Sequence, residues 1–119
     1  EIFKSINGLK YVMASEGDDF DIIATQQSLW MWQVLEFNDL KKDKILREGE
    51  RVYLEFKKNR SKSEFHLVEE GETLYSISQH HGLRLEKLSH KNRMNADSKL
   101  EVGQKIFLRK RKSKNYSAE

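Results

Sequence analysis

The sequence contains an internal repeat. When the chain is aligned with itself at an offset of 54 positions, residues 11–58 lie over residues 65–112 without a gap. The identical pairs include acidic, glycine, asparagine and apolar residues: Glu16/Glu70, Gly17/Gly71, Ile23/Ile77, Leu29/Leu83, Asn38/Asn92, Asp43/Asp97, Leu46/Leu100, Gly49/Gly103 and Leu54/Leu108. A repeat that keeps its glycines and its apolar positions predicts two consecutive small units with the same fold.

The second copy shows the pattern of one unit most clearly. It predicts a strand, two helices and a strand, in that order, over residues 65–68, 74–80, 85–92 and 105–109. Thr73 is placed to cap the first helix and Gly82 to end it. The same order in both copies predicts an α+β fold of two tandem βααβ units. Each is expected to be a two-stranded antiparallel sheet with two helices packed on one face.

The alignment also predicts the two cores. The first is expected to contain Ala14, Phe20, Ile23, Leu29, Met31, Val34, Leu40, Leu46, Val52 and Leu54. The second is expected to contain Val68, Leu74, Ile77, Leu83, Leu85, Leu88, Met94, Leu100, Ile106 and Leu108. Before the first copy, Asn7-Gly8 lies between two apolar segments, which is typical of a two-residue hairpin turn and predicts an outer strand on the first unit.

Composition and charge exclude several kinds of site. The chain has no cysteine, so it can form neither a disulfide nor a thiolate metal site. It has no run of about 20 apolar residues, so no membrane span is expected. The net charge is +3, and the excess lies in residues 57–63 and 109–114. Basic runs of this kind keep a chain solvated and attract polyanions weakly, so no specific nucleic-acid partner is expected.

Catalytic and metal-binding patterns are also missing from the sequence. His80 and His81 are adjacent and therefore point in different directions on a helix, and neither His66 nor His90 has the spacing of a metal ligand. No nucleophile motif occurs, and nothing indicates a pair of carboxylates facing each other across a cleft. No enzyme activity, cofactor or metal is therefore expected in this segment.

Two segments of the second copy resemble the LysM family. Residues 66–78, HLVEEGETLYSIS, are similar to the opening of a LysM domain, and Asn92 with residues 100–108, LEVGQKIFL, is similar to its end. The first copy is similar but diverged, with Gly17-Asp18-Asp19-Phe20 in place of Gly-Asp/Glu-Thr-Leu. The resemblance implies the βααβ fold and binding of N-acetylglucosamine-containing glycans, mainly bacterial peptidoglycan and chitin. In that family, tandem copies often follow the catalytic domain of a peptidoglycan hydrolase, such as an N-acetylglucosaminidase or an amidase.

The resemblance implies a shallow sugar groove between the loop after the first strand and the loop after the second helix. In the second copy these loops carry Gly71, Glu72, Thr73, Leu74, Met94, Asn95, Ala96, Asp97 and Leu100. In the first copy the matching positions are Gly17, Asp18, Asp19, Phe20, Leu40, Lys41, Lys42, Asp43 and Leu46. Loop backbone groups can bind an N-acetyl group, and Leu74 or Leu100 can seat its methyl. Since the Lys41-Lys42 pair would have to be desolvated by a neutral sugar, the first site is expected to be the weaker one.

Several of these residues also have structural explanations. Thr73 suits a helix cap as well as a sugar contact, and Asn38 and Asn92 suit loop bracing better than sugar binding. Trp30 and Trp32 align with charged residues, so a contact between the repeats is favoured over a sugar-stacking platform.

The expected organisation has four parts. Residues 1–58 form a first, degenerate LysM-like domain with its hairpin, residues 59–63 a basic linker, residues 64–110 a second LysM domain, and residues 111–119 a basic tail. Residues 57–63 are polar and charged, so they are expected to lack a buried face. The expected partner of this monomer is peptidoglycan or a chitin-like N-acetylglucosamine polymer, on which it holds an attached catalytic domain. The resemblance implies a periplasmic, cell-envelope or secreted location. The alternative is a structural or protein-interaction module that has lost glycan binding.

Overall fold

The computed structural model describes residues 2–4 and 7–116. This part of the chain is a mixed α/β structure with four helices and two small antiparallel sheets. The chain divides into two compact units, residues 1–57 and residues 58–119, which are called unit 1 and unit 2 below. Within the described ranges, no helix has the length and apolar character needed to cross a membrane.

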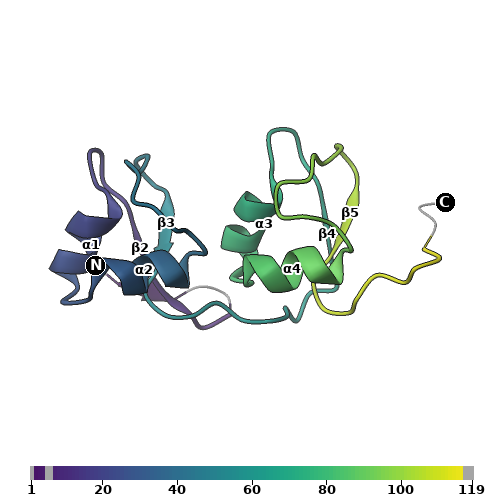
Figure 1. Cartoon of the computed structure of the whole chain (residues 1–119), viewed down its shortest axis with the longest axis horizontal. Coiled ribbons are helices and arrows are strands. Elements are labelled where there is room, and N and C mark those ends of the chain that lie inside the picture. The colour runs from purple at the N-terminus through teal and green to yellow at the C-terminus, as the bar shows by residue number, and fades with distance from the viewer. Residues whose placement is uncertain (1, 5–6, 117–119) are drawn as a thin grey trace. The chain divides into compact units, whose positions relative to one another are not determined.

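Unit 2 contains two strands and two helices. In chain order they are β4 (Phe65–Leu67), α3 (Leu74–His81), α4 (Leu85–Lys91) and β5 (Lys105–Phe107). The two strands pair antiparallel, with His66 opposite Ile106. Figure 1 shows α3 and α4 on one side of this strand pair.

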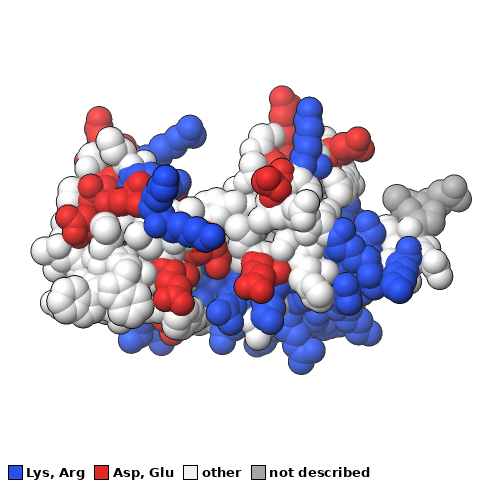
Figure 2. Space-filling model, in the orientation of Figure 1, with Lys and Arg blue, Asp and Glu red and all other residues white. Residues whose placement is uncertain are grey.

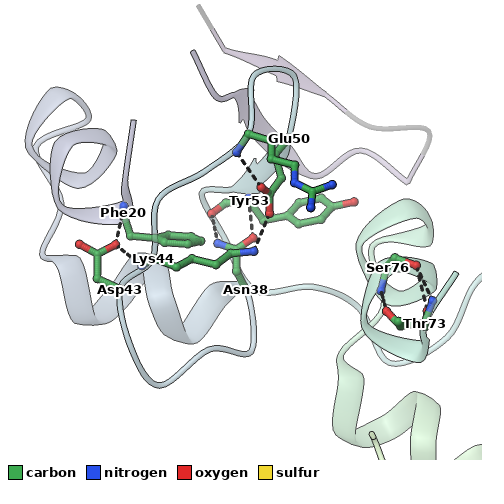
Figure 3. A network of polar contacts seen from close by, with 9 residues as sticks. Phe20, Asn38, Asp43, Lys44, Glu50, Tyr53, Thr73 and Ser76 are labelled. Atoms are coloured by element: carbon green, nitrogen blue, oxygen red, sulfur yellow. Dashed lines mark hydrogen bonds and ion pairs between the residues drawn. The ribbon is translucent and has the colours of Figure 1, made fainter. Parts of the chain in front are cut away.

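Local sequence signals set both ends of α3. The Thr73 hydroxyl accepts a hydrogen bond from the Ser76 N–H at 3.0 Å, and Ser76 Oγ accepts one from the Thr73 N–H at 2.9 Å (Figure 3). These two bonds satisfy backbone donors that the first turn of a helix leaves unpaired. At the other end, Gly82 has φ 68, in the left-handed region that glycine adopts without strain. The predicted cap and stop are confirmed.

The predicted core of unit 2 is confirmed in full. Its buried members are Val68, Leu74, Ile77, Leu83, Leu88, Ile106 and Leu108, and Leu85, Met94 and Leu100 pack against them half-buried. The apolar positions of two short helices and a strand pair recur with a regular spacing, so the sequence alone identifies them.

Unit 1 has the same types of element with one strand more. In chain order they are β1 (Phe3–Lys4), β2 (Lys10–Met13), α1 (Phe20–Gln26), α2 (Met31–Phe37) and β3 (Arg51–Tyr53). The three strands form one antiparallel sheet in the order β1-β2-β3. The side-chain carboxylate of Asp19 caps α1 by accepting from the Ile22 N–H at 2.8 Å.

The outer strand predicted for unit 1 is confirmed, but its two-residue turn is wrong. Lys4 pairs with Lys10, so residues 5–9 connect the strands, and of these Ser5 and Ile6 lie outside the described residues. The Phe3 ring stacks on the Tyr11 ring with centroids 5.7 Å apart. This cross-strand pair favours the observed register over the one that a turn at Asn7-Gly8 would impose.

The core of unit 1 differs from the prediction in two ways. It lacks Met31, which was predicted, and it includes Val12, Ala24 and Leu35, which were not. Met31 is 36% exposed and is not part of it. The buried core consists of Val12, Ala14, Phe20, Ile23, Ala24, Val34, Leu35, Leu46 and Val52, with Leu29, Leu40 and Leu54 half-buried against it. Met31 is the first residue of α2, where a seven-residue helix gives too few turns to identify its inner face from spacing alone.

A buried asparagine connects the second helix of each unit to the last strand. In unit 1, Asn38 Nδ2 donates to the carbonyls of Val34 and Tyr53, and Asn38 Oδ1 accepts from the Tyr53 N–H at 2.8 Å (Figure 3). In unit 2, Asn92 makes the matching three bonds, to Leu88 and to both backbone groups of Phe107. The prediction that these asparagines brace loops is confirmed.

Residues 57–63 do have buried members, contrary to prediction. The Lys57 side chain is fully buried, and Ser61 is buried too. Lys58 exchanges backbone hydrogen bonds of 2.8 Å with Gly82 and Arg84, and the Ser61 N–H donates to the Leu108 carbonyl at 3.0 Å. Backbone pairing of this kind does not depend on side-chain polarity, so the composition of residues 57–63 did not reveal it.

Candidate functional site

Two loops of unit 2 form the candidate site: the β4–α3 loop (residues 68–73) and the α4–β5 loop (residues 92–104). Gly71 lies at the tip of the first, with φ 83. A Cβ there would meet no atom within 4 Å, so the turn conformation rather than lack of space requires glycine. In the second loop, the Asn95 N–H donates to Ser98 Oγ at 3.0 Å and the Asn95 carbonyl accepts from the Ser98 N–H at 3.1 Å.

Several predicted site residues of unit 2 have structural roles. Leu74 is 0% exposed, so the prediction that its side chain seats the acetyl methyl is wrong, because a core position cannot reach a ligand. Thr73 caps α3, and the Glu72 carboxylate accepts from the Glu69 N–H at 2.7 Å. The half-buried Met94 and Leu100 remain as apolar contact surface, beside the exposed Asn95, Ala96 and Asp97.

Hydrogen bonds join the matching loops of unit 1. The Phe20 N–H donates to Asp43 Oδ1 at 2.8 Å (Figure 3), and the Leu46 N–H donates to the Asp18 carbonyl at 2.8 Å. Asp19 and Ile45 also form an isolated antiparallel bridge. The polar groups that a sugar would need there are therefore already paired within unit 1.

The remaining predicted residues of unit 1 offer no better surface. Phe20 and Leu46 are buried in the core, and Leu40 packs against it half-buried. Lys41 and Lys42 are exposed next to the joined loops, and Gly17, with φ 85, forms the turn before Asp18.

No hydrogen bond joins residues 71–74 to residues 94–100 in unit 2, all of which belong to the described part of the chain. In unit 1, the Phe20 N–H and the Leu46 N–H each donate to the opposite loop. In unit 2, the aligned Leu74 N–H and Leu100 N–H, both within the described ranges, make no bond to the opposite loop. In unit 2 the predicted residues thus lie on two loop segments, 71–74 and 94–100, whose described backbone groups are not hydrogen-bonded to each other.

A histidine cluster under the β4–α3 loop was missed by sequence reasoning. His66 Nε2–H donates to the Glu72 carboxylate, and His66 Nδ1 lies 2.8 Å from His81 Nε2. The His80 ring contacts both other imidazoles. The signal was present in the alignment of the chain with itself, in which His66 and His81 stand opposite Val12 and Gln27.

Burial and the neighbouring histidines change the protonation of this cluster. Burial first, and then the charges of His80 and His66, lower the pKa of His81 to about 4. Burial raises the pKa of Glu72, but its bonds from His66 and from the Glu69 N–H lower it more, so the net pKa is below the usual value. His81 is therefore neutral at pH 7. No group of three or more metal-ligating side chains in the described residues could hold a metal ion.

Unit 2 is expected to lose about 2 kcal/mol of stability as the pH falls from 6.5 to 4 because of His81, with solvent screening of the half-buried ring taken into account. In this window the unfolded chain binds a proton at His81 and the folded chain does not, so stability decreases with falling pH. The measurement is urea unfolding followed by unit 2 amide signals, compared with His81→Gln, the residue that unit 1 has at this position. An NMR titration midpoint near 6.5 for His81, or an equal pH dependence in the variant, would contradict this.

Comparison with known proteins identifies one of the two units. The family model described as "LysM domain" matches residues 66–109. A LysM domain occupies that segment of unit 2. It contains both candidate loops, and LysM domains bind N-acetylglucosamine-containing glycans. The match does not extend over unit 1.

Two solved structures are similar to the chain. The Bacillus cereus spore cortex-lytic enzyme SleL is 26% identical with a TM-score of 0.37, and the similarity covers 84% of this chain and 22% of that one. The Bacillus megaterium QM B1551 enzyme of the same name is 18% identical with a TM-score of 0.38, covering 88% and 23%. The chain thus spans less than a quarter of either structure. No curated protein sequence matches it.

Proposed function

We propose that the chain is a non-catalytic glycan-binding segment that uses the LysM domain of unit 2 to bind N-acetylglucosamine-containing glycan, most of all peptidoglycan. The observation that carries this proposal is that the described loops at residues 71–74 and 94–100, in the segment that matches the family, are not hydrogen-bonded to each other. Backbone groups of these loops can donate to and accept from the acetamido group, and Met94 and Leu100 offer an apolar seat for its methyl.

Unit 1 is proposed to be a second, diverged LysM unit that contributes little sugar binding. Its sequence aligns with the LysM domain, it contains strands and helices in the same order, and Asn38 makes the same three bonds as Asn92. In this proposal the domains are residues 1–58 and 64–110, with residues 59–63 between them and residues 111–119 at the end. Its joined loops support a structural role for unit 1.

The biological role proposed is to hold an attached catalytic domain on the cell wall. A shallow site with a few hydrogen bonds of about 1 kcal/mol each binds weakly by itself. A glycan polymer, however, offers many identical sites close together, so a chain that dissociates from one site can rebind at a neighbouring one. Such an anchoring role requires that the protein be located at the cell wall.

Titration with chitotetraose, an uncharged N-acetylglucosamine tetramer, is expected to shift the amide signals of residues 71–74 and 94–100 first. Amides of residues 17–20 and 40–46 should respond weakly or not at all, because their loops are already hydrogen-bonded to each other. The measurement is a two-dimensional NMR titration, together with co-sedimentation of the chain with purified peptidoglycan sacculi. Earlier saturation of unit 1 would reverse the assignment of the site.

A protein-interaction module is the second candidate, and the exposed indoles of unit 1 favour it. Trp30 is 70% exposed and Trp32 is 61% exposed, and exposed tryptophans are common in protein interfaces. The earlier idea that they contact the other repeat stays a prediction. If neither chitotetraose nor sacculi bind at low or moderate salt, this candidate replaces the glycan-binding proposal.

A further inference from the structure

Unit 1 contains a buried ion pair just after its second helix. Asp39 follows Asn38, the last residue of the α2 cap, and has φ 60. Its carboxylate lies 2.6 Å from Lys57 Nζ, and the Lys57 side chain is 0% exposed. In unit 1, the buried Lys57 ammonium is thus paired with a carboxylate of the same unit, that of Asp39.

The aligned positions of unit 2 hold two arginines. Arg93 stands 54 positions after Asp39, follows the cap residue Asn92 in the same way and has φ 55, while Arg111 stands 54 positions after Lys57. Where unit 1 has a cation and an anion, unit 2 therefore has two cations. Among residues 2–4 and 7–116, no carboxylate forms an ion pair with either arginine.

Hydrogen bonds to backbone carbonyls hold the Arg93 side chain and the segment that carries Arg111. The Arg93 Nε–H donates to the Lys112 carbonyl at 2.6 Å, and the Lys112 N–H donates to the Lys91 carbonyl at 2.8 Å. These bonds fix the segment after β5 against the end of α4, and the Tyr116 ring contacts the Phe107 ring at 5.1 Å. The residues expected as a solvated tail thus bring Arg111 next to α4. The terminal amino groups of Arg93 are not used by these bonds.

Both arginines line a pocket that reaches the candidate sugar loop. It has a volume of about 480 Å³ and is lined by His90, Arg93, Met94, Asn95, Ser98 and Arg111. Met94 and Asn95 are also members of the glycan-binding loop proposed above. A ligand on that loop therefore lies at a pocket that two arginines line.

Positive charge extends from this pocket along α4. His90 and Arg111 also line a neighbouring pocket of about 290 Å³, together with Asn59, Arg60, Lys87 and Lys91. Figure 2 shows Lys and Arg gathered below α4 and along the segment after β5. Burial and then the positive charge of Arg60 lower the pKa of Lys91, as expected where cations are close together. The exposed Glu86 lines an adjoining pocket with Lys87, His90 and Met94.

The geometry points to an anion site at Arg93 and Arg111 that binds a carboxylate of an acidic N-acetylglucosamine glycan lying on the Met94–Asn95 loop. This inference rests on the proposed function and adds a charged group to its ligand: the site is expected to prefer glycans that carry a free carboxylate over neutral ones such as chitin. A carboxylate is the group that Asp39 presents to Lys57 in unit 1, and guanidinium groups bind carboxylates in two-point geometry. In peptidoglycan, every second sugar carries a lactyl carboxylate or a peptide attached to it, whereas chitin carries none.

The experiment compares three oligosaccharides of equal length: the tetrasaccharide of alternating N-acetylglucosamine and N-acetylmuramic acid, its methyl ester, and chitotetraose. Wild-type chain should bind the acid about tenfold more tightly than the ester at 150 mM salt, measured by NMR titration. Arg93→Asp should abolish this difference and leave chitotetraose affinity unchanged. The control Lys114→Asp changes the charge by the same amount outside both pockets and should keep the tenfold difference.

The Arg93→Asp variant is expected to fold, because the introduced carboxylate can pair with Arg111 as Asp39 pairs with Lys57, and aspartate tolerates a positive φ better than arginine does. If thermal unfolding nevertheless shows a lower midpoint, Arg93→Gln provides the same comparison without reversing the charge.

Each other outcome overturns the inference. Equal affinities for acid and ester in wild type would refute it while the glycan-binding function stands. If no oligosaccharide binds, the proposed function fails as well. An equal loss of chitotetraose binding in Arg93→Asp would make Arg93 a support of the loop only. Tighter binding of a 20-base-pair DNA duplex than of the acid, sensitive to Arg93→Asp, would assign the surface to nucleic acid instead.

Discussion

Replacing Asp39 by asparagine is expected to destabilise unit 1 by about 3 kcal/mol. The change keeps the shape of the side chain and its tolerance of φ 60, but leaves the buried Lys57 ammonium without its carboxylate. Burial already lowers the pKa of Lys57, and Asp39 raises it in part. Native-state hydrogen exchange of the amide protons in β2 and β3 measures the loss.

The pH dependence and a second variant test the cause of this loss. Since the folded chain holds Lys57 at a lowered pKa, the unfolded chain binds more protons between that pKa and the usual one, and stability rises with pH in this window. The loss in Asp39→Asn should therefore shrink as the pH approaches 10. Lys57→Met removes the charge but keeps an apolar stem, and should cost less than about 1 kcal/mol. A loss below 1 kcal/mol for Asp39→Asn would contradict the prediction.

Asn92→Ala is expected to destabilise unit 2 by about 3 kcal/mol. The side chain is 2% exposed, and its removal leaves the Phe107 N–H and carbonyl buried without their partner. A core of this size holds only about 3–5 kcal/mol, so much of the LysM domain should unfold at 37 °C. The measurement is urea unfolding followed by amide signals of unit 2.

Two matched variants show whether the effect is specific. Asn95→Ala changes the same residue type at an exposed position of the next loop and should cost less than about 0.5 kcal/mol. Asn38→Ala should produce the loss in unit 1 and leave unit 2 unchanged. If Asn92→Ala unfolded at the same urea concentration as wild type, the three hydrogen bonds of the Asn92 side chain would contribute no net stability.

The candidate loops were predicted from the sequence, but the roles of their residues were predicted only in part. Thr73 was expected to cap a helix, and it does so because capping depends on a few neighbouring residues. Leu74 was expected to touch the sugar and is instead fully buried. A single sequence does not show which loop residues face inward, because that depends on how the two loops pack against the core.

The hydrogen bonds that distinguish the two units could not be predicted from the sequence either. The bond between the Phe20 N–H and Asp43 spans 23 positions, and the bond between His66 and His81 spans 15. Asp43 and Asp97 are identical in the repeat, yet the described structure shows the bond to the opposite loop only in unit 1. Identical residues can therefore differ in role when the loop that carries them takes a slightly different path.

The sequence by itself determined the order of the elements, the cap residues, the whole core of unit 2 and most of the core of unit 1, because apolar spacing and capping act over a few residues. Only the tertiary structure decided where the basic segments lie. In unit 2, the pairing of Ser61 with Leu108 and of Lys112 with Lys91 brings together charges that the sequence places at two separate sites. These backbone bonds form between distant residues of any type, so neither composition nor periodicity predicts them. They place Arg111 in the same pocket as Arg93.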